Sequence, residues 1–148
     1  MTTQYLLLVE DDPDDEALTL KALKRHQIAN PVQIVRDGAQ ALDFLLGPDR
    51  QGTREPNLPQ VVLLDLKLPK VDGLEVLQAI RAHPLTQKLP VIIFTSSREE
   101  SDILKAYGFG ANSFVRKPVE FNEFMAAAGQ LGLYWLLLNT PPQDPGMK

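Results

Sequence analysis

A cluster of carboxylates follows the first hydrophobic run of this sequence. The segment LLLVEDDPDD spans residues 6–15, and its last six positions hold five acidic residues and one proline. Carboxylates a few ångströms apart destabilise the folded state or hold a proton, unless a cation lies between them. The segment therefore predicts a bound cation.

Polar residues with complementary chemistry follow later hydrophobic runs, namely Asp65, Thr95, Ser96 and Lys117. Ligands of α/β sheets bind outside the carboxyl ends of the strands. If these ends converge on Glu10 and Asp11, the site holds three carboxylates, hydroxyl groups and one ammonium, which leaves a formal charge of −2 before an ion enters. A divalent cation would neutralise that charge.

The ligand chemistry of the predicted site favours Mg²⁺. Its donors are hard oxygen atoms, and the chain contains no cysteine. An octahedral Mg²⁺ keeps several waters and takes few protein oxygens, which leaves room for a phosphoryl group. Phosphoryl transfer needs positioning and charge neutralisation by metal, ammonium and hydroxyl groups. We predict that Asp65 accepts the phosphoryl group.

The elements that must position these residues alternate along the chain. Short apolar runs predict strands at 5–9, 32–35, 61–64, 91–94 and 113–116. Helix-period segments predict helices at 13–26, 39–46, 73–82, 98–107 and 121–131. Alternating units of this kind predict an α/β fold with a doubly wound, five-stranded parallel sheet and helices on both faces.

Composition limits the class of protein. The 148 residues are 44% hydrophobic and 23% charged, which suits a single globular domain. The net charge of −4 gives no basic surface for nucleic acid or an anionic membrane. The first hydrophobic run is too short to be a secretory core or to cross a bilayer. We expect a cytoplasmic protein.

The motifs VEDD, LLDLKLPKVDGLEVL, IIFTSS and FVRKPV resemble those of two-component response regulator receiver domains, in order and spacing, from residue 6 to about 131. The resemblance implies a CheY-like, flavodoxin-like fold with strand order 2-1-3-4-5. It also implies roles for individual residues: phosphoacceptor Asp65, direct metal ligand Asp11, metal carboxylate Glu10, metal-binding backbone carbonyl of Lys67, switch residues Thr95 and Phe114, phosphate-binding Lys117, and Pro118 in a cis turn.

The C-terminal stretch LGLYWLLLNTPP extends the minimal receiver. Together with the polar loop at 49–60, it resembles the single-domain response regulators of cyanobacterial phytochromes, which implies a homodimer. We assign residues 1–138 to the domain and expect 139–148 to be a flexible tail. The predicted interface uses the fifth-helix side and the extension: Leu133, Tyr134, Trp135, Leu136 and Leu137. The alternative is that these residues pack in the domain's own core.

The resemblance implies a stand-alone response regulator that is phosphorylated on Asp65 by a histidine kinase, with a phytochrome kinase and a phosphotransfer protein as candidate partners. Phosphorylation would change a protein-binding surface, so the chain is not expected to be an enzyme. Two alternatives remain: a docking module that is never phosphorylated, and a phosphohydrolase with an aspartate nucleophile. The hydrolase resemblance would require an acid two residues after the nucleophile, where this chain has Lys67.

Some of the candidate residues have simpler structural interpretations. The acidic residues Asp12, Asp14, Asp15 and Glu16 could serve only to stabilise a helix N-terminus. Phe114 could be a fixed part of the core. The sequence does not separate these alternatives.

Overall fold

The computed structural model describes residues 4–47 and 58–140. Five parallel strands form one sheet in the order β2-β1-β3-β4-β5. The strands are β1 (Leu6–Val9), β2 (Val32–Val35), β3 (Val61–Leu64), β4 (Val91–Thr95) and β5 (Ser113–Arg116). The predicted strand order and parallel pairing are confirmed.

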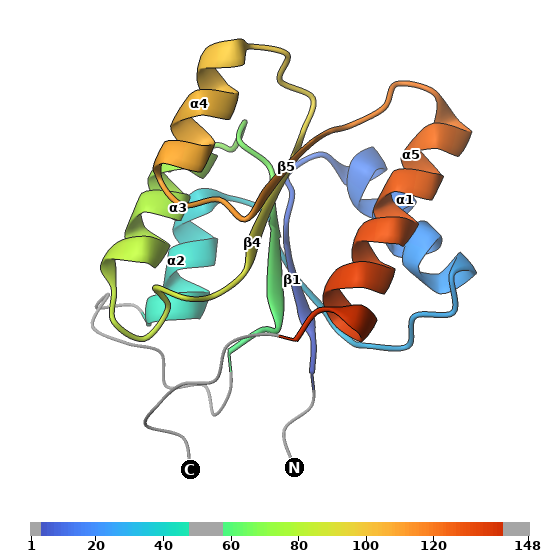
Figure 1. The fold of residues 1–148 in the computed structure, drawn as a ribbon, viewed down its shortest axis with the longest axis horizontal. Coiled ribbons are helices and arrows are strands. Elements are labelled where there is room, and N and C mark those ends of the chain that lie inside the picture. Colours follow the sequence, from blue (N-terminus) through green and yellow to red (C-terminus); the bar gives the residue numbers. More distant parts are fainter. Residues whose placement is uncertain (1–3, 48–57, 141–148) are drawn as a thin grey trace.

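Helices cover both faces of the sheet (Figure 1). One face carries α2 (Gly38–Leu46), α3 (Gly73–Ala82) and α4 (Glu100–Gly108); the other carries α1 (Pro13–Arg25) and α5 (Phe121–Gly132). The chain then continues from α5 into a π-helix, η1 (Leu133–Leu138). Predicted and observed bounds differ by at most two residues, with the largest difference at the start of α4.

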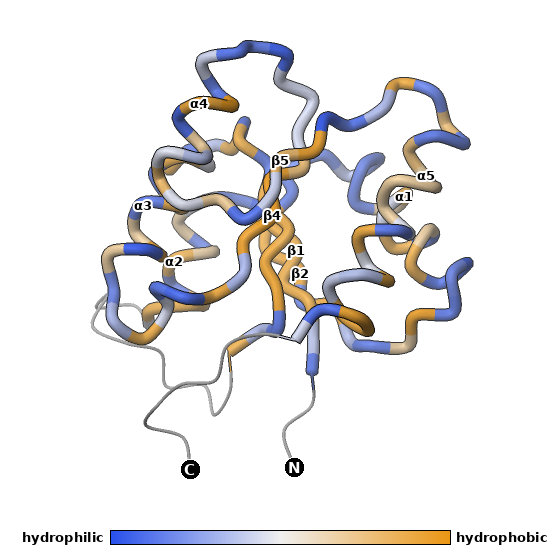
Figure 2. The backbone as a smooth tube through the Cα atoms, viewed as in Figure 1, coloured by the Kyte–Doolittle hydropathy of each residue, from blue (hydrophilic) through white to orange (hydrophobic). Residues whose placement is uncertain are grey.

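The core consists of two layers divided by the sheet. Alternate strand residues such as Leu7 and Val9 pack toward α2 and α3, whereas Leu6 and Leu8 pack toward α1 and α5. The central strands are therefore hydrophobic along their whole length (Figure 2). Continuous apolar runs are expected in a parallel sheet with two covered faces.

The acidic segment after β1 begins helix α1. The Asp12 side chain accepts hydrogen bonds from the backbone N–H groups of Asp14 and Asp15, at 2.8 and 3.3 Å. Pro13 occupies the first helical turn, where the missing N–H group costs nothing. Asp12 is thus a helix cap, which is the structural interpretation left open for it.

The C-terminal extension corrects part of the predicted interface. Leu136 is only 3% exposed and packs with the core beside α5, and Trp135 is half-buried against the same cluster. Leu133, Tyr134 and Leu137 are exposed. An all-apolar segment does not reveal which of its side chains face inward, and here the π-helical turn places Leu136 inside.

Parts of two predictions lie outside the described residues. The loop expected at 49–60 is described only from residue 58, and the tail expected at 139–148 only up to residue 140. In the described ranges, no helix is both long enough and apolar enough to cross a membrane.

Candidate functional site

The carboxyl edge of the sheet brings together charged residues from four elements. Glu10 follows β1, Asp65 follows β3, Lys117 follows β5, and Asp15 lies in the first turn of α1. Lys117 Nζ lies 2.6 Å from Glu10 Oε1, 2.8 Å from Asp65 Oδ2 and 2.8 Å from Asp15 Oδ2. All three hydrogens of the ammonium therefore have a carboxylate acceptor.

Asp65 is buried and its two oxygens have separate partners. Oδ1 accepts a hydrogen bond from Thr95 Oγ1 at 2.7 Å and another from the backbone N–H of Lys67 at 3.2 Å. Oδ2 accepts from Lys117. The loop after β3 packs closely at this point, because a Cβ atom on Gly73 would lie 2.3 Å from the Asp65 carbonyl oxygen.

The electrostatics of the cluster are dominated by burial and by its excess of carboxylates. Burial raises the pKa of Glu10 from its ordinary value of 4.5 to about 7, although Lys117 opposes the shift. Burial works to lower the pKa of Lys117, but the charges of Asp65 and Glu10 raise it overall. Counted with every group charged, the four carboxylates of the cluster, Asp11 included, and the one ammonium give a formal charge of −3.

Three of these acids could hold a metal ion. Glu10, Asp11 and Asp65 each offer a carboxylate oxygen, and these atoms lie within 4.8 Å of one another. Asp11 is exposed, so a hydrated ion can reach the group. All three are hard oxygen donors, which suit Mg²⁺ and leave coordination positions for water. The residues therefore fit a divalent magnesium ion.

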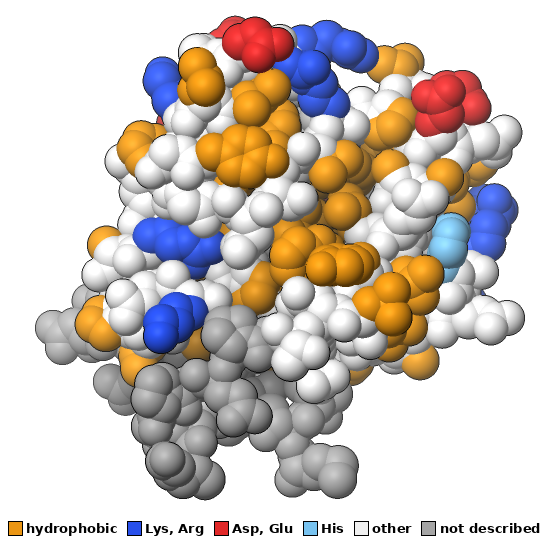
Figure 3. Space-filling model, viewed as in Figure 1, with side chains coloured by type: hydrophobic (Ala, Val, Ile, Leu, Met, Phe, Trp, Pro, Cys, Tyr) orange, Lys and Arg blue, Asp and Glu red, His pale blue; other side chains and the backbone are white. Residues whose placement is uncertain are grey.

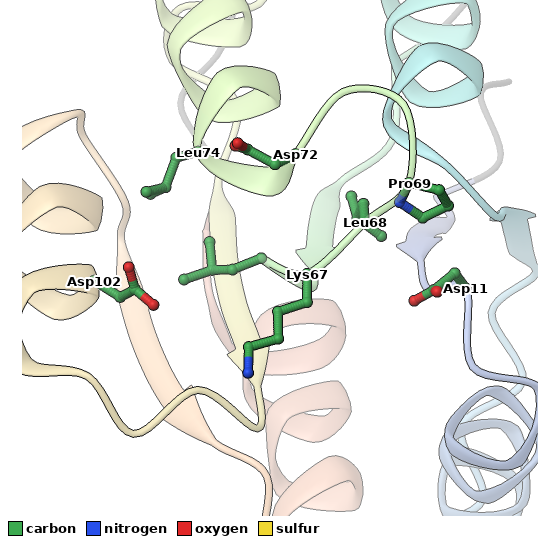
Figure 4. A pocket seen from close by; sticks show the side chains of 8 residues that line it. Asp11, Lys67, Leu68, Pro69, Asp72, Leu74 and Asp102 are labelled. Atoms are coloured by element: carbon green, nitrogen blue, oxygen red, sulfur yellow. The ribbon is translucent and has the colours of Figure 1, made fainter.

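An open pocket of about 430 Å³ lies beside the acids and is lined by Asp11, Lys67 and Asp102, among others (Figure 4). Asp102 extends from α4 on the far wall from Asp11. Its Oδ2 accepts a hydrogen bond from Ser97 Oγ at 2.5 Å. The pocket is large enough for a phosphoryl group and metal-bound waters.

Two further predicted residues lie near this edge. Phe114 lies on β5, where it is half-buried against the core layer of α2 and α3. No cis peptide bond occurs in residues 4–47 and 58–140, so the bond before Pro118 is trans and the predicted cis turn is wrong. The two isomers of an X–Pro bond differ by only about 0.5–1 kcal/mol, so a Lys-Pro pair does not fix the isomer.

Sequence reasoning did not identify Asp15 as part of this cluster. Its position in an acidic run at a helix start is explained equally well by the helix dipole. Asp15 lies in the first turn of the helix that directly follows β1. This position could have indicated that Asp15 lies at the carboxyl edge of the sheet, because the chain enters the helix from the end of that strand.

A family comparison decides the class of the protein. Residues 6–129 match the model of the response regulator receiver domain. The chain belongs to the response regulator receiver family. The sheet order and the acids at its carboxyl edge agree with the predicted membership of this family.

Several response regulators resemble the chain over nearly its full length. Response regulator Rcp1 of Synechocystis is 35% identical over 94% of this chain and 93% of its own, and its Mn²⁺-bound crystal form has a TM-score of 0.84. The structure of the phosphorylated cyanobacterial phytochrome response regulator RcpA is 31% identical in sequence and has a TM-score of 0.85. The match covers 96% of this chain and 100% of RcpA. The bacteriophytochrome response regulator RtBRR is 53% identical and has a TM-score of 0.71. The match covers 98% of this chain and 86% of RtBRR.

Proposed function

We propose that this receiver accepts a phosphoryl group on Asp65 from the phosphohistidine of a sensor histidine kinase. The observation that supports this most directly is the surroundings of Asp65. Its carboxylate lies among Thr95, Lys117 and the Lys67 N–H, next to acids that fit a metal ion. Such a site can both orient a carboxylate nucleophile and neutralise a phosphoryl group.

In the proposed transfer, a carboxylate oxygen of Asp65 attacks phosphorus. A P–O bond forms as the P–N bond of the phosphohistidine breaks. The electron pair of that bond stays on the imidazole nitrogen, which takes up a proton. The products are an acyl phosphate on Asp65 and a neutral histidine on the kinase.

The residues around Asp65 have different roles in this transfer. Glu10, Asp11, Asp65 and the Lys67 carbonyl would hold Mg²⁺, which when bound supplies positive charge to the phosphoryl oxygens. Lys117 donates from the β5 side, and the Thr95 hydroxyl donates from β4. With donors on several sides, the negative charge that spreads over the phosphoryl oxygens is stabilised.

We propose that the output is a change of surface. The phosphoryl group brings a charge of about −1.5 to −2, which competes with Asp65 Oδ1 for the Thr95 hydroxyl. A shift of Thr95 changes the space available to the half-buried Phe114 on β5. Hydrophobic side chains gather on the face of α4, β5 and α5 (Figure 3). Leu104 and Tyr107 of α4 are exposed. This face would present two packings to partners.

The proposed kinase partner is a phytochrome, because the chain resembles RcpA, a cyanobacterial phytochrome response regulator, and RtBRR, a bacteriophytochrome response regulator. We also propose a homodimer that uses the α5 side and the exposed residues of the extension, Leu133, Tyr134 and Leu137. Exposed apolar groups of this kind mark contact surfaces. Residues 1–138 would form the domain and 139–148 a tail outside it.

Intact-mass measurement after incubation with acetyl phosphate and Mg²⁺ tests the acceptor role. The wild type should gain a phosphate adduct, whereas Asp65→Asn should gain none. Asp14→Asn is the matched control, since Asp14 is an exposed aspartate of the same edge. An unlabelled wild type would favour the docking module, and rapid turnover of small phosphomonoesters would favour the hydrolase.

Sedimentation at micromolar protein tests the dimer. The wild type should sediment as a dimer, and Leu137→Asp should shift it to monomer because a charge would enter an apolar contact. Leu85→Asp is the control, because Leu85 is also an exposed leucine but lies in the turn after α3, outside the proposed contact surface. Monomeric wild type with and without phosphorylation would exclude the proposed assembly.

A further inference from the structure

Asp15 is the third carboxylate at the Lys117 ammonium, beside Glu10 and Asp65, and it is not one of the acids that fit a metal. Its Oδ2 lies 2.8 Å from Lys117 Nζ, as close as the oxygen of Asp65. Its backbone is fixed in the first turn of α1, because its carbonyl accepts from Thr19 Oγ1 at 2.8 Å. The contact is therefore built into the start of the helix.

Asp15 approaches Lys117 from a different side than the metal-fitting acids do. Asp15 and Lys117 together line a pocket of about 270 Å³ that is also bounded by Phe121 of α5. Asp11 and Lys67 line the separate pocket on the α4 side. The ion pair with Asp15 thus holds the ammonium toward α1 and α5.

The three carboxylates that accept from Lys117 differ in whether water can replace the ammonium when it moves. The Glu10 side chain is 2% exposed and that of Asp65 is 7% exposed, so neither can exchange Lys117 for water. The Asp15 side chain is 25% exposed and can. A phosphoryl group on Asp65 needs at least one donor from Lys117, and Asp15 is the acceptor that releases it at the lowest cost.

We propose that Asp15 is a positioning residue for Lys117, which competes with the incoming phosphoryl group for the ammonium. This inference rests on the proposed phosphorylation of Asp65. The ion pair stabilises the unphosphorylated site and must break, or lengthen, when the phosphoryl group arrives. Asp15 consequently sets how strongly the site binds a phosphodonor.

The first test measures the rate of labelling against acetyl phosphate concentration at saturating Mg²⁺. Asp15→Asn should lower the half-saturating concentration about fivefold, as expected for a partly exposed ion pair, and leave the maximal rate nearly unchanged. Asp14→Asn is the control for long-range charge. It removes the same charge from the same turn, and Asp14 has no ion pair among the described residues. Asp15→Glu should keep the wild-type concentration dependence.

A double-mutant cycle with Lys117→Gln separates the contact from a general effect on structure. In the Lys117→Gln background, Asp15→Asn should not change the half-saturating concentration of acetyl phosphate. The same cycle in urea unfolding with EDTA gives a readout that needs neither metal nor phosphate. In that cycle, the double mutant should lose less free energy of unfolding than the sum of the two single mutants, as expected for two groups that attract each other.

The outcomes distinguish this inference from the function on which it rests. If the wild type is labelled through Asp65 but Asp15→Asn behaves like Asp14→Asn, the positioning role is wrong and the acceptor role stands. A rise in the half-saturating concentration, or additivity in both cycles, would also overturn it. If Asp65→Asn is labelled as well as wild type, the proposed function itself fails.

Discussion

The two ends of the sheet bury polar groups in opposite ways. At the carboxyl end, Lys117 contacts the carboxylates of Glu10 and Asp65, and all three side chains are at most 7% exposed. At the amino end, the Gln60 amide before β3 donates to the carbonyls of Trp135 and Leu136, at 3.1 and 3.2 Å. One end is charged and incompletely neutralised, whereas the other is neutral.

The difference indicates where the fold can respond to a ligand. A neutral amide bonded to two carbonyls gains nothing from a cation or a phosphoryl group, so it serves to fix η1 against the sheet. A buried cluster with excess negative charge is stabilised by whatever supplies positive charge. The comparison predicts that substitutions at the carboxyl end change stability in a metal-dependent way, and that substitutions at the amino end do not.

The largest effect on stability is expected for Lys117→Met. The substitution leaves Glu10 and Asp65 buried without their cation, which should destabilise the metal-free protein by about 3 kcal/mol. Urea unfolding with EDTA at pH 8 measures the change. Lys70→Met is the control, because its ammonium is exposed and lies 3.6 Å from Asp37, and it should cost less than about 1 kcal/mol. If the two substitutions lowered the free energy of unfolding equally, burial of the Lys117 ion pairs would not be the cause of the loss.

The second effect is a pH dependence caused by Glu10. Because its pKa is raised from 4.5 to about 7 in the folded state, the folded protein binds more protons than the unfolded chain in that range. Metal-free stability should therefore fall as pH rises from about 4.5 to about 7, by about 3 kcal/mol in total. Urea unfolding at successive pH values measures this slope.

Glu10→Gln should flatten that part of the profile, and Glu123→Gln, at an exposed position of α5, is the control. Mg²⁺ binds the ionised form, so it should raise wild-type stability more at pH 8 than at pH 5. A metal-free profile with the same slope in wild type and Glu10→Gln would show that another group titrates.

The smallest effect is expected at the amino end. Gln60→Leu removes two hydrogen bonds to η1 but also removes Oε1, which has no partner in the part of the chain that the structure describes. The loss should be about 1 kcal/mol, with no change in labelling by acetyl phosphate. Gln130→Leu, at an exposed position of α5, is the control. A Gln60→Leu protein that labels more slowly would mean that the two ends are coupled.

The strands and the acids at their ends could be predicted because local pattern determines them. Val61–Leu64 is apolar at every position since both faces of the sheet are covered, and Asp65 follows at once. Parallel pairing then brings Asp65 and Glu10 to one edge whatever the details of the loops. The family resemblance gave the strand order, which no single motif specifies.

Other features depend on packing that sequence alone does not show. Leu136 and Leu137 are identical neighbours, yet one is 3% exposed and the other 54%, because only the path of η1 decides which of them faces the core. Asp14 and Asp15 likewise differ only in which of them points toward Lys117. The isomer of the bond before Pro118 is set by the surrounding loop and was predicted wrongly.

Chemical mapping of the label shows whether Asp65 is the residue that carries the phosphoryl group. Borohydride reduces an acyl phosphate on aspartate to homoserine, which peptide mass analysis locates. After labelling with acetyl phosphate and Mg²⁺, we expect homoserine at position 65 and at no other aspartate. Homoserine at Asp11, Asp12 or Asp15 instead, or none in a protein that has gained phosphate, would contradict it.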